Sequence, residues 1–421
     1  MVNQQVPGVP LRRELGLFEV TLSGVGIILG AGVYVLIGQA AGLCGNAVWL
    51  AFFLAAVMAL LTGLSYAELS SLFPRAGAEY DYVKNAFNAH AAFVIGWLVF
   101  LSGILAASTV ALGFGGYFEA LTGVPVLVSA LLLLLALTVV LALGIRETVR
   151  VAVVSAIIEA AGLVIIIAIG LPRLGTVSYW ELPQGFLGLF AATGLIFFAF
   201  QGFESMVKFS DEAKDPESTI PKALILALAV SLVLYILVAL SAVSVAGWEQ
   251  LATSGAPFSD IVSGTLGPDW AVIITVIALF ATANTVLMSL YASTRLLYGM
   301  AGPPYLPAAF AYVHPGRRTP LNAITISGHA AGPGGSSVAR ELAMAGKNVL
   351  IIERGDFDPV KGSAMQFTKT AFMPGKGLIV TNGFLGMLRG ITTGGSSLYF
   401  CATAFDPPLE MFKSYGVDLT K

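Results

Sequence analysis

The sequence has few charged residues, few cysteines and few histidines. Only 11% of its 421 residues are charged, and the formal net charge is −2. Such a weak charge gives no electrostatic reason to expect nucleic acid binding. The two cysteines, Cys44 and Cys401, lie far apart, and the three histidines show no metal-ligand spacing. The sequence therefore predicts no metal site, and its cysteines do not indicate a redox compartment.

Apolar residues dominate instead. Hydrophobic residues make up 57% of the chain, and the mean hydropathy is +0.86. Apolar runs of about 20 residues are long enough to cross a bilayer. We expect an all-α polytopic membrane protein, with an uncleaved first span because no signal-peptide cleavage site follows the short polar start. The eight expected spans cover residues 15–40, 47–71, 91–119, 124–145, 151–171, 185–205, 222–246 and 269–299.

Lysine and arginine collect on alternate sides of these spans. Basic residues precede the first span and follow the second, fourth, sixth and eighth. The loops at 120–123 and 247–268 have none, and the loop at 172–184 has only Arg173. Because basic residues accumulate on the cytoplasmic side, we expect a multi-pass protein of the cytoplasmic membrane with a cytoplasmic amino terminus. Everything after the eighth span is expected on the same side.

The first span, which includes LSGVGIILGAGVYVLIG at 22–38, is interrupted repeatedly by glycine. Gly30-Ala31-Gly32 can let a membrane helix unwind and turn backbone N–H and C=O groups toward a ligand. Alternatively, these glycines are close-packing contacts between helices. Five spans later, residues 185–205 carry Gly194 and Gly202 around an aromatic patch. Two interrupted helices at this interval favour a shared ligand site.

Four motifs resemble amino acid permeases of the amino acid-polyamine-organocation superfamily. They are GAGVYVLIG in the first span, YAELSSLFPRAGAEYDYVKNAF at 66–87, FFAFQGFES at 197–205 and DEAKDPESTIPKAL at 211–224, and the match runs from about residue 10 to 326. The resemblance implies two inverted five-helix repeats, a substrate site between broken helices 1 and 6, and alternating access. Eight spans would make this 5+5 fold truncated, without helices 9 and 10.

An amino acid carries a carboxylate and an ammonium group, which half-helix N–H ends and unwound carbonyls can bind. By resemblance, the carboxylate would be held by Gly30, Ala31 and Gly32. The sixth span would contribute Phe198 in the position of an aromatic gate, with Ala199, Phe200 and Gly202. Gln201 stands where the family more often has an apolar residue, so it either touches the substrate or packs.

Glu159 lies in the middle of the fifth span. A carboxylate at that depth is expensive, so it should face the interior of the bundle. We interpret it as a proton carrier or part of a proton site, with hydroxyls of the eighth span such as Ser289 or Ser293. The alternative is a protonated structural residue bonded to a neighbouring helix. Asn284 would serve the same site or hold helices together, and we favour the second role.

The chain changes character near residues 324–332. Residues 1–328 hold 30 charged residues, whereas 329–421 hold 16. A short strand, AITI at 323–326, is followed by AGPGGSSVARELAMAGKNVLIIERGD at 331–356, in the order of a glycine turn, a helix and a strand ending in an acid. This order predicts a partial α/β Rossmann-like unit over 327–421, after a permease domain at 1–326.

Residues 329–421 look like the amino-terminal FAD-binding part of glucose-methanol-choline family oxidoreductases or a related flavoprotein group. By resemblance, FAD would be bound at Gly332, Gly334, Gly335 and Glu353, and at Gly394, Gly395 and Ser396. Ala330 replaces the first fingerprint glycine, and the region is too short for a substrate domain, so we expect no enzyme activity. A natural fusion, a frameshifted pseudogene and an assembly error all fit this junction.

Three functions follow. The first is secondary transport of amino acids or related amines, coupled to protons or sodium, with a weak preference for neutral amino acids. The second is a membrane-tethered FAD-binding oxidoreductase fragment. The third is a non-functional truncated fusion.

Overall fold

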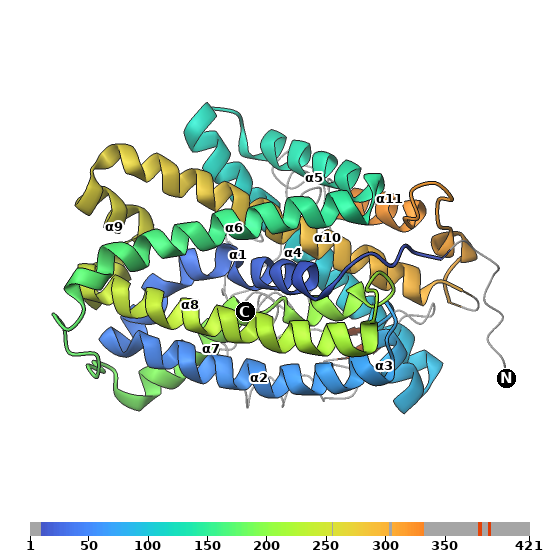
Figure 1. Cartoon of the computed structure of the whole chain (residues 1–421), viewed down its shortest axis with the longest axis horizontal. Helices are drawn as coiled ribbons and strands as arrows, with labels where there is room; N and C mark the ends of the chain where they lie inside the picture. The colour runs from blue at the N-terminus through green and yellow to red at the C-terminus, as the bar shows by residue number, and fades with distance from the viewer. Residues whose placement is uncertain (1–9, 255, 303–304, 332–377, 381–385, 389–421) are drawn as a thin grey trace, which may run out of the picture. The chain divides into compact units, whose positions relative to one another are not determined.

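The computed structural model describes residues 10–254, 256–302, 305–331, 378–380 and 386–388, and the chain divides into unit 1, Met1–Val338, and unit 2, Ala339–Lys421. Unit 1 is a bundle of helices (Figure 1), eight of which are long and apolar enough to cross a membrane among the described residues. The eight predicted spans are confirmed. Their helices are α1 Leu17–Cys44, α2 Val48–Leu72, α4 Ala89–Thr122, α5 Val126–Leu143, α6 Ile145–Gly170, α7 Gly185–Phe200, α8 Pro216–Thr253 and α10 Ala271–Met300.

Shorter helices connect these spans. The α-helices are α3 Glu79–Ala86, α9 Pro257–Leu266 and α11 Leu321–His329, and the 3₁₀ helices are η1 Gly45–Ala47, η2 Leu171–Arg173, η3 Phe203–Phe209, η4 Pro268–Trp270 and η5 Ala308–Ala311. The backbone of α8 is non-helical at Gly247. The apolar span therefore stops at 246, the predicted boundary, and a short helical piece follows it.

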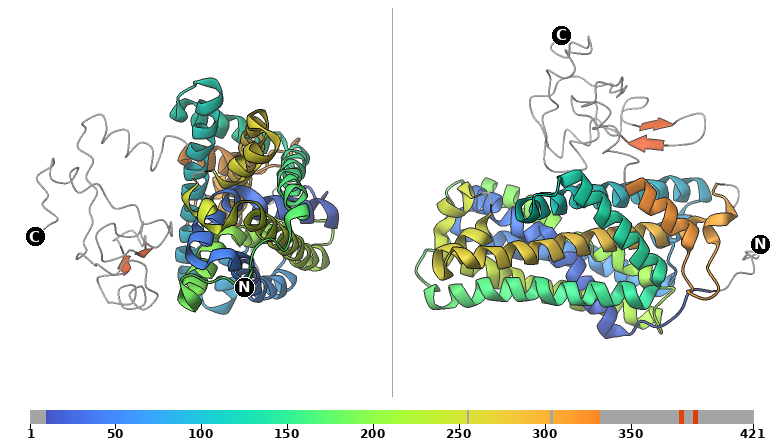
Figure 2. Two further views of the ribbon diagram at one scale, coloured as in Figure 1. Left: turned by 90° about the vertical axis from the view of Figure 1, so that its left-hand side faces the viewer. Right: turned by 90° about the horizontal axis from the view of Figure 1, so that it is seen from above.

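Helix α1 lies inside the bundle. It contacts α6, α7, α8 and α10, and Figure 2 (left) shows these helices around it nearly end-on. On the outside, large apolar side chains such as Leu135 and Leu187 are 64% and 83% exposed. A bundle that is apolar both inside and outside matches a lipid environment, so unit 1 is a multi-pass membrane domain.

Close helix contacts depend on small residues. A Cβ atom at Gly26 would lie 2.7 Å from the Cβ of Ala156 on α6, and a Cβ at Gly63 would lie 2.7 Å from Leu228 on α8. Backbones that approach this closely gain dispersion contacts that larger side chains would prevent. The packing interpretation is therefore correct for Gly26, one of the glycines of residues 22–38.

One end of the bundle collects the basic residues. We call it the basic end; it is the end at which α1 begins and α2 stops, beside α3 and α11 on the right of Figure 1. Its basic residues are Arg12, Arg13, Arg75, Lys84, Arg146, Arg150, Lys208, Lys214, Lys222, Arg295, Arg317 and Arg318.

Two buried ion pairs stabilise the basic end. Arg295 of α10 donates from Nη2 and Nε to the two carboxylate oxygens of Glu212, at 2.8 and 2.9 Å, and both side chains are fully buried. Tyr291 adds a hydroxyl donor to the same carboxylate. Lys208 in η3 pairs with Glu79 of α3 at 2.6 Å. These pairs join the segment after α7 to α10 and α3.

The prediction of a strand at 323–326 is wrong. These residues lie within helix α11, which packs against α5 and α10. A four-residue apolar run has no distinguishing period, so neighbouring apolar helices decide its conformation. The described part of unit 2 is a two-stranded antiparallel sheet of β1 Leu378–Val380 and β2 Gly386–Leu388. The predicted FAD-binding residues, 332–335, 353 and 394–396, lie outside the described residues.

The buried pair at the basic end predicts the effect of Glu212→Gln. Removing the carboxylate leaves the Arg295 charge buried without compensation, which costs roughly 3–5 kcal/mol. The thermal unfolding midpoint of the purified protein in detergent should fall by several degrees. Arg12→Gln is the matched control. Arg12 pairs with Glu14, but its side chain is 54% exposed, and exposed ion pairs contribute about 0–1 kcal/mol to the free energy of unfolding. Equal midpoints for the two variants would contradict this account.

Candidate functional site

Helix α1 is broken at Gly30. The φ and ψ angles of Gly30 are 8° and −165°, a non-helical conformation that kinks the 28-residue element near its middle. Thr285 of α10 lies beside the break, since a Cβ atom on Gly30 would be 2.6 Å from its Oγ1. The predicted unwinding of the first span is confirmed at this residue.

Helix α7 is broken five residues before the end of the predicted sixth span. It stops at Phe200, Gln201 is extended, and Gly202 has φ of 114°, a conformation that L side chains rarely adopt. The 3₁₀ helix η3 follows directly. The predicted interruption of the sixth span is therefore confirmed at Gly202, whereas Gly194 lies within helix α7.

The two breaks lie against each other. A Cβ atom on Gly32 would be 3.2 Å from the Cα of Ala199, and a Cβ on Gly202 would overlap the side chain of Ile27. Of the predicted substrate-binding residues, Gly32 thus meets Ala199, and Gly202 meets Ile27 of α1, whereas Gly30 lies against Thr285. The side chain of Ala31 lies outside the part of the chain that the structure describes.

Tyr235 of α8 joins the breaks. Its hydroxyl lies 2.6 Å from the carbonyl oxygen of Ile28 on α1 and 3.1 Å from that of Ala199 on α7. The ring is fully buried and packs edge-on against Phe200, with centroids 5.0 Å apart. Sequence reasoning missed this residue, because a single tyrosine in an apolar span has no signal beyond its hydroxyl.

The aromatic residues of α7 differ in exposure. Phe200 is fully buried, whereas Phe198, the predicted gate, is 43% exposed. Gln201 is also exposed. The amide N–H of Gly202 is bonded to the carboxylate of Glu204 at 2.8 Å. This carboxylate therefore already has a partner at the broken end.

Glu159 faces the interior of the bundle, as predicted. It is fully buried, and its Oε1 accepts a 3.0 Å hydrogen bond from Asn284 Nδ2 of α10. Its backbone carbonyl accepts from the hydroxyl of Tyr34 on α1, at 3.1 Å. Oε2 of Glu159 and Oδ1 of Asn284 are buried without a hydrogen-bond partner among the described residues. The pair leaves two acceptor oxygens that a proton or a cation would satisfy.

The structure pairs Glu159 with Asn284 and not with the hydroxyls of Ser289 or Ser293. Ser293 lies against α4, because a Cβ atom on Gly103 would overlap its Oγ. Ser293 follows Asn284 by nine positions, which is about half a turn around a helix with roughly 3.6 residues per turn. One face of α10 therefore meets Glu159, and the opposite face meets α4.

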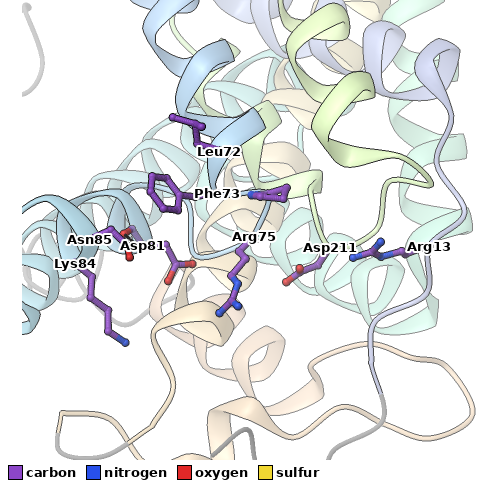
Figure 3. Close-up of a pocket in the computed structure, with 9 residues that line it drawn as sticks. Arg13, Leu72, Phe73, Arg75, Asp81, Lys84, Asn85 and Asp211 are labelled. Atoms are coloured by element: carbon purple, nitrogen blue, oxygen red, sulfur yellow. Dashed lines mark hydrogen bonds between the residues drawn. The ribbon is translucent and has the colours of Figure 1, made fainter. Parts of the chain in front are cut away.

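A cavity of about 580 Å³ opens at the basic end. It is bordered by Arg13, by the segment from Leu72 to Arg75, by α3 and by Asp211. Figure 3 shows Arg75 between the carboxylates of Asp81 and Asp211, with Arg13 pointing toward Asp211. Burial raises the pKa of Asp81 to about 6, although Arg75 and Lys84 oppose this effect.

Two discontinuous helices that meet inside a membrane bundle define a class of protein, the secondary transporters with a broken-helix site. Comparison with known proteins agrees. The family model described as "Amino acid permease" matches residues 15–329. The chain belongs to this family.

Relatives and solved structures are consistent with this assignment. The chain is 34% identical to the branched-chain amino acid permease BcaP of Bacillus subtilis (strain 168), over 74% of this chain and 71% of that protein. It is 32% identical to the methylthioribose transporter of the same organism, over 78% and 75% of the two chains. The fold is similar to that of a Na⁺-coupled sialic acid symporter, with a TM-score of 0.56 at 12% identity, covering 79% and 76%.

The contact between the breaks predicts that Gly202→Ala is destabilising. Alanine disfavours φ of 114° and its methyl group would push against Ile27, with a backbone cost of about 1–3 kcal/mol. Amide hydrogen exchange over residues 27–32 should become faster. The control is Gly194→Ala within α7, where a Cβ meets nothing within 4 Å and alanine is favoured by about 0.5–1 kcal/mol. Unchanged exchange in Gly202→Ala would show that the breaks do not depend on each other.

Proposed function

We propose that this protein is a secondary active transporter of amino acids, and that it binds the substrate where α1 and α7 are broken. The observation that carries this proposal is the hydroxyl of Tyr235, which bonds to carbonyls beside both breaks. Irregular backbone inside a membrane domain is tolerated around a polar site. A zwitterion suits the site, since peptide N–H groups bind its carboxylate and carbonyls bind its ammonium.

The residues of this site are Gly30, Ala31 and Gly32 for the carboxylate, with Phe198, Ala199, Phe200, Gln201 and Gly202 on the α7 side. Neutral amino acids fit best. Glu204, the carboxylate that follows the α7 break, is already bonded to the N–H of Gly202, so it is not available for a cationic side chain. In this proposal α1 and α7 are corresponding helices of two inverted repeats.

We further propose that the protein lies in the cytoplasmic membrane with its basic end and its amino terminus in the cytoplasm. Twelve lysine and arginine residues gather at that end, whereas the loop at 172–184 has only Arg173. Positive charge is retained on the cytoplasmic side during insertion.

Binding of radiolabelled amino acids tests the substrate. Purified protein should bind a neutral aliphatic amino acid, and Tyr235→Phe should weaken binding by about 5- to 30-fold, since it leaves two buried carbonyls without a donor at about 1–2 kcal/mol in total. Tyr179→Phe is the control, because that hydroxyl bonds Ser244 and Gly175 away from the breaks. Tighter binding of arginine or lysine would reject the neutral class, and no binding of any amino acid would reject the proposal.

We propose that Glu159 couples transport to an ion, most simply a proton. A proton on Oε2 would remove a buried charge and turn this unpaired acceptor into a donor. In this arrangement Asn284, and not Ser289 or Ser293, is the residue of α10 that contacts Glu159.

Glu159→Gln should abolish ion-driven uptake into proteoliposomes while leaving substrate binding within about twofold. A glutamine can still accept from Asn284 and can donate to its Oδ1, so the fold should persist. Glu119→Gln, at an exposed carboxyl near the end of α4, is the control and should transport normally. If Glu159→Gln retains the pH and sodium dependence of uptake, Glu159 has no part in coupling.

A further inference from the structure

A second cavity lies at the basic end, and neither helix break lines it. Its volume is about 500 Å³, and it is lined by the segment before α1, the first turn of α1, the start of α6 and Lys214. Its polar side includes Arg13, Arg150 and Lys214, and its apolar side includes Phe18, Val149 and Val153. A cavity with one basic and one apolar side has the chemistry of an amphiphile site.

The carboxylates of this cavity are already engaged. Glu14 pairs with Arg12 and Arg146 at 2.5 and 2.6 Å. Glu19 accepts the backbone N–H of Gly16 at 3.0 Å and so caps the start of α1. Glu14 therefore compensates Arg146, which also lines the cavity, and neither acid forms an ion pair with Arg150 or Lys214.

Arg150 and Lys214 are exposed and form no ion pair within 4.0 Å among the described residues. Arg13 is shared with the neighbouring cavity, where it points toward Asp211 (Figure 3). The cavity therefore presents at least two unpaired cations to an incoming anion. A phosphate group accepts charge-assisted hydrogen bonds from such donors.

The apolar side of the cavity continues along the outside of the bundle. Phe18 is 68% exposed. On α6, Arg150 is followed at helical spacing by Val154, Ile157 and Val164, which are 49%, 57% and 51% exposed. Residues at these intervals share one face of a helix. A hydrophobic stripe therefore runs from the basic cavity along the surface that the bilayer covers.

We propose that this cavity binds the headgroup of an anionic phospholipid, such as phosphatidylglycerol, whose acyl chains lie along the α6 stripe. The lipid would come from the leaflet that faces the basic end, and this part rests on the proposed cytoplasmic orientation. Basic pockets between membrane helices on that side are suited to anionic headgroups. The apolar stripe favours a lipid over a free phosphate.

The bound lipid would join three segments. The backbone before α1 is paired with the loop after η3, through Glu14 N–H to Glu212 O at 2.9 Å and Lys214 N–H to Leu15 O at 2.9 Å. Arg150 adds α6 to this group. A headgroup held by Arg150 and Lys214 would therefore link α6 to the loop that carries the buried Glu212.

Lipid binding to the full chain in neutral detergent tests this proposal. Native mass spectrometry with dioctanoyl phosphatidylglycerol, dioctanoyl phosphatidylcholine and glycerol 3-phosphate distinguishes the contribution of the headgroup charge to binding from that of the acyl chains. Phosphatidylglycerol should bind best. Arg150→Gln and Lys214→Gln should each weaken its binding about fivefold, the effect expected for one basic residue. Arg173→Gln, an exposed arginine in the loop at 172–184, is the matched control and should have no effect.

Val153→Trp tests the same cavity without changing its charge, because it fills the apolar side and should reduce phosphatidylglycerol binding while both cations remain. Equal binding of the two phospholipids, or binding unaffected by all three cavity variants, would overturn the proposal. Glycerol 3-phosphate binding as tightly as the lipid would overturn the lipid assignment.

The orientation of the protein in the membrane is checked separately in a Cys401→Ser background. An impermeant thiol reagent should label Gly175→Cys but not Arg12→Cys in intact cells.

Discussion

The structure depends on one constraint, which is that a backbone polar group inside a bilayer must find its partner within the protein. Unbroken helices meet this requirement automatically, but α1 and α7 do not. Tyr235 meets this requirement in part, because its hydroxyl donates to the carbonyl oxygens of Ile28 and Ala199. Because one hydroxyl serves two helices, it holds the breaks of α1 and α7 against each other.

The same constraint explains the placement of charge. Buried ion pairs occur at the basic end, where Glu212 meets Arg295 and Lys208 meets Glu79. Charges that are expensive to bury are best retained when each is fully paired. In these pairs one partner stands in or directly after η3, and the other stands on α10 or α3. The segment that leaves the α7 break is therefore fixed by electrostatics and not by apolar packing alone.

Much of this arrangement was predictable, because hydropathy and glycine are local signals. The eight spans follow from long apolar runs, and the breaks at Gly30 and Gly202 follow from glycines within those runs. Partners distant in sequence do not, since Tyr235 and the Glu212–Arg295 pair depend on how helices rotate against each other. The same uncertainty affected Glu159, whose interior position was confirmed while Asn284 replaced the expected serines as its partner. The strand at 323–326 was wrong because four apolar residues do not specify a period.

The position of Asn284 bears on how an ion site could act on the substrate site. Asn284 bonds Glu159 and lies against Gly26, and the next residue, Thr285, lies against Gly30. The backbone carbonyl of Glu159 also accepts from the hydroxyl of Tyr34 on α1. If Glu159 changes charge as proposed, Asn284 would carry the change to α1 at Gly26, before the break. Helix α1 would then move with the protonation state, because tightly packed glycine contacts leave no room for Asn284 to shift alone.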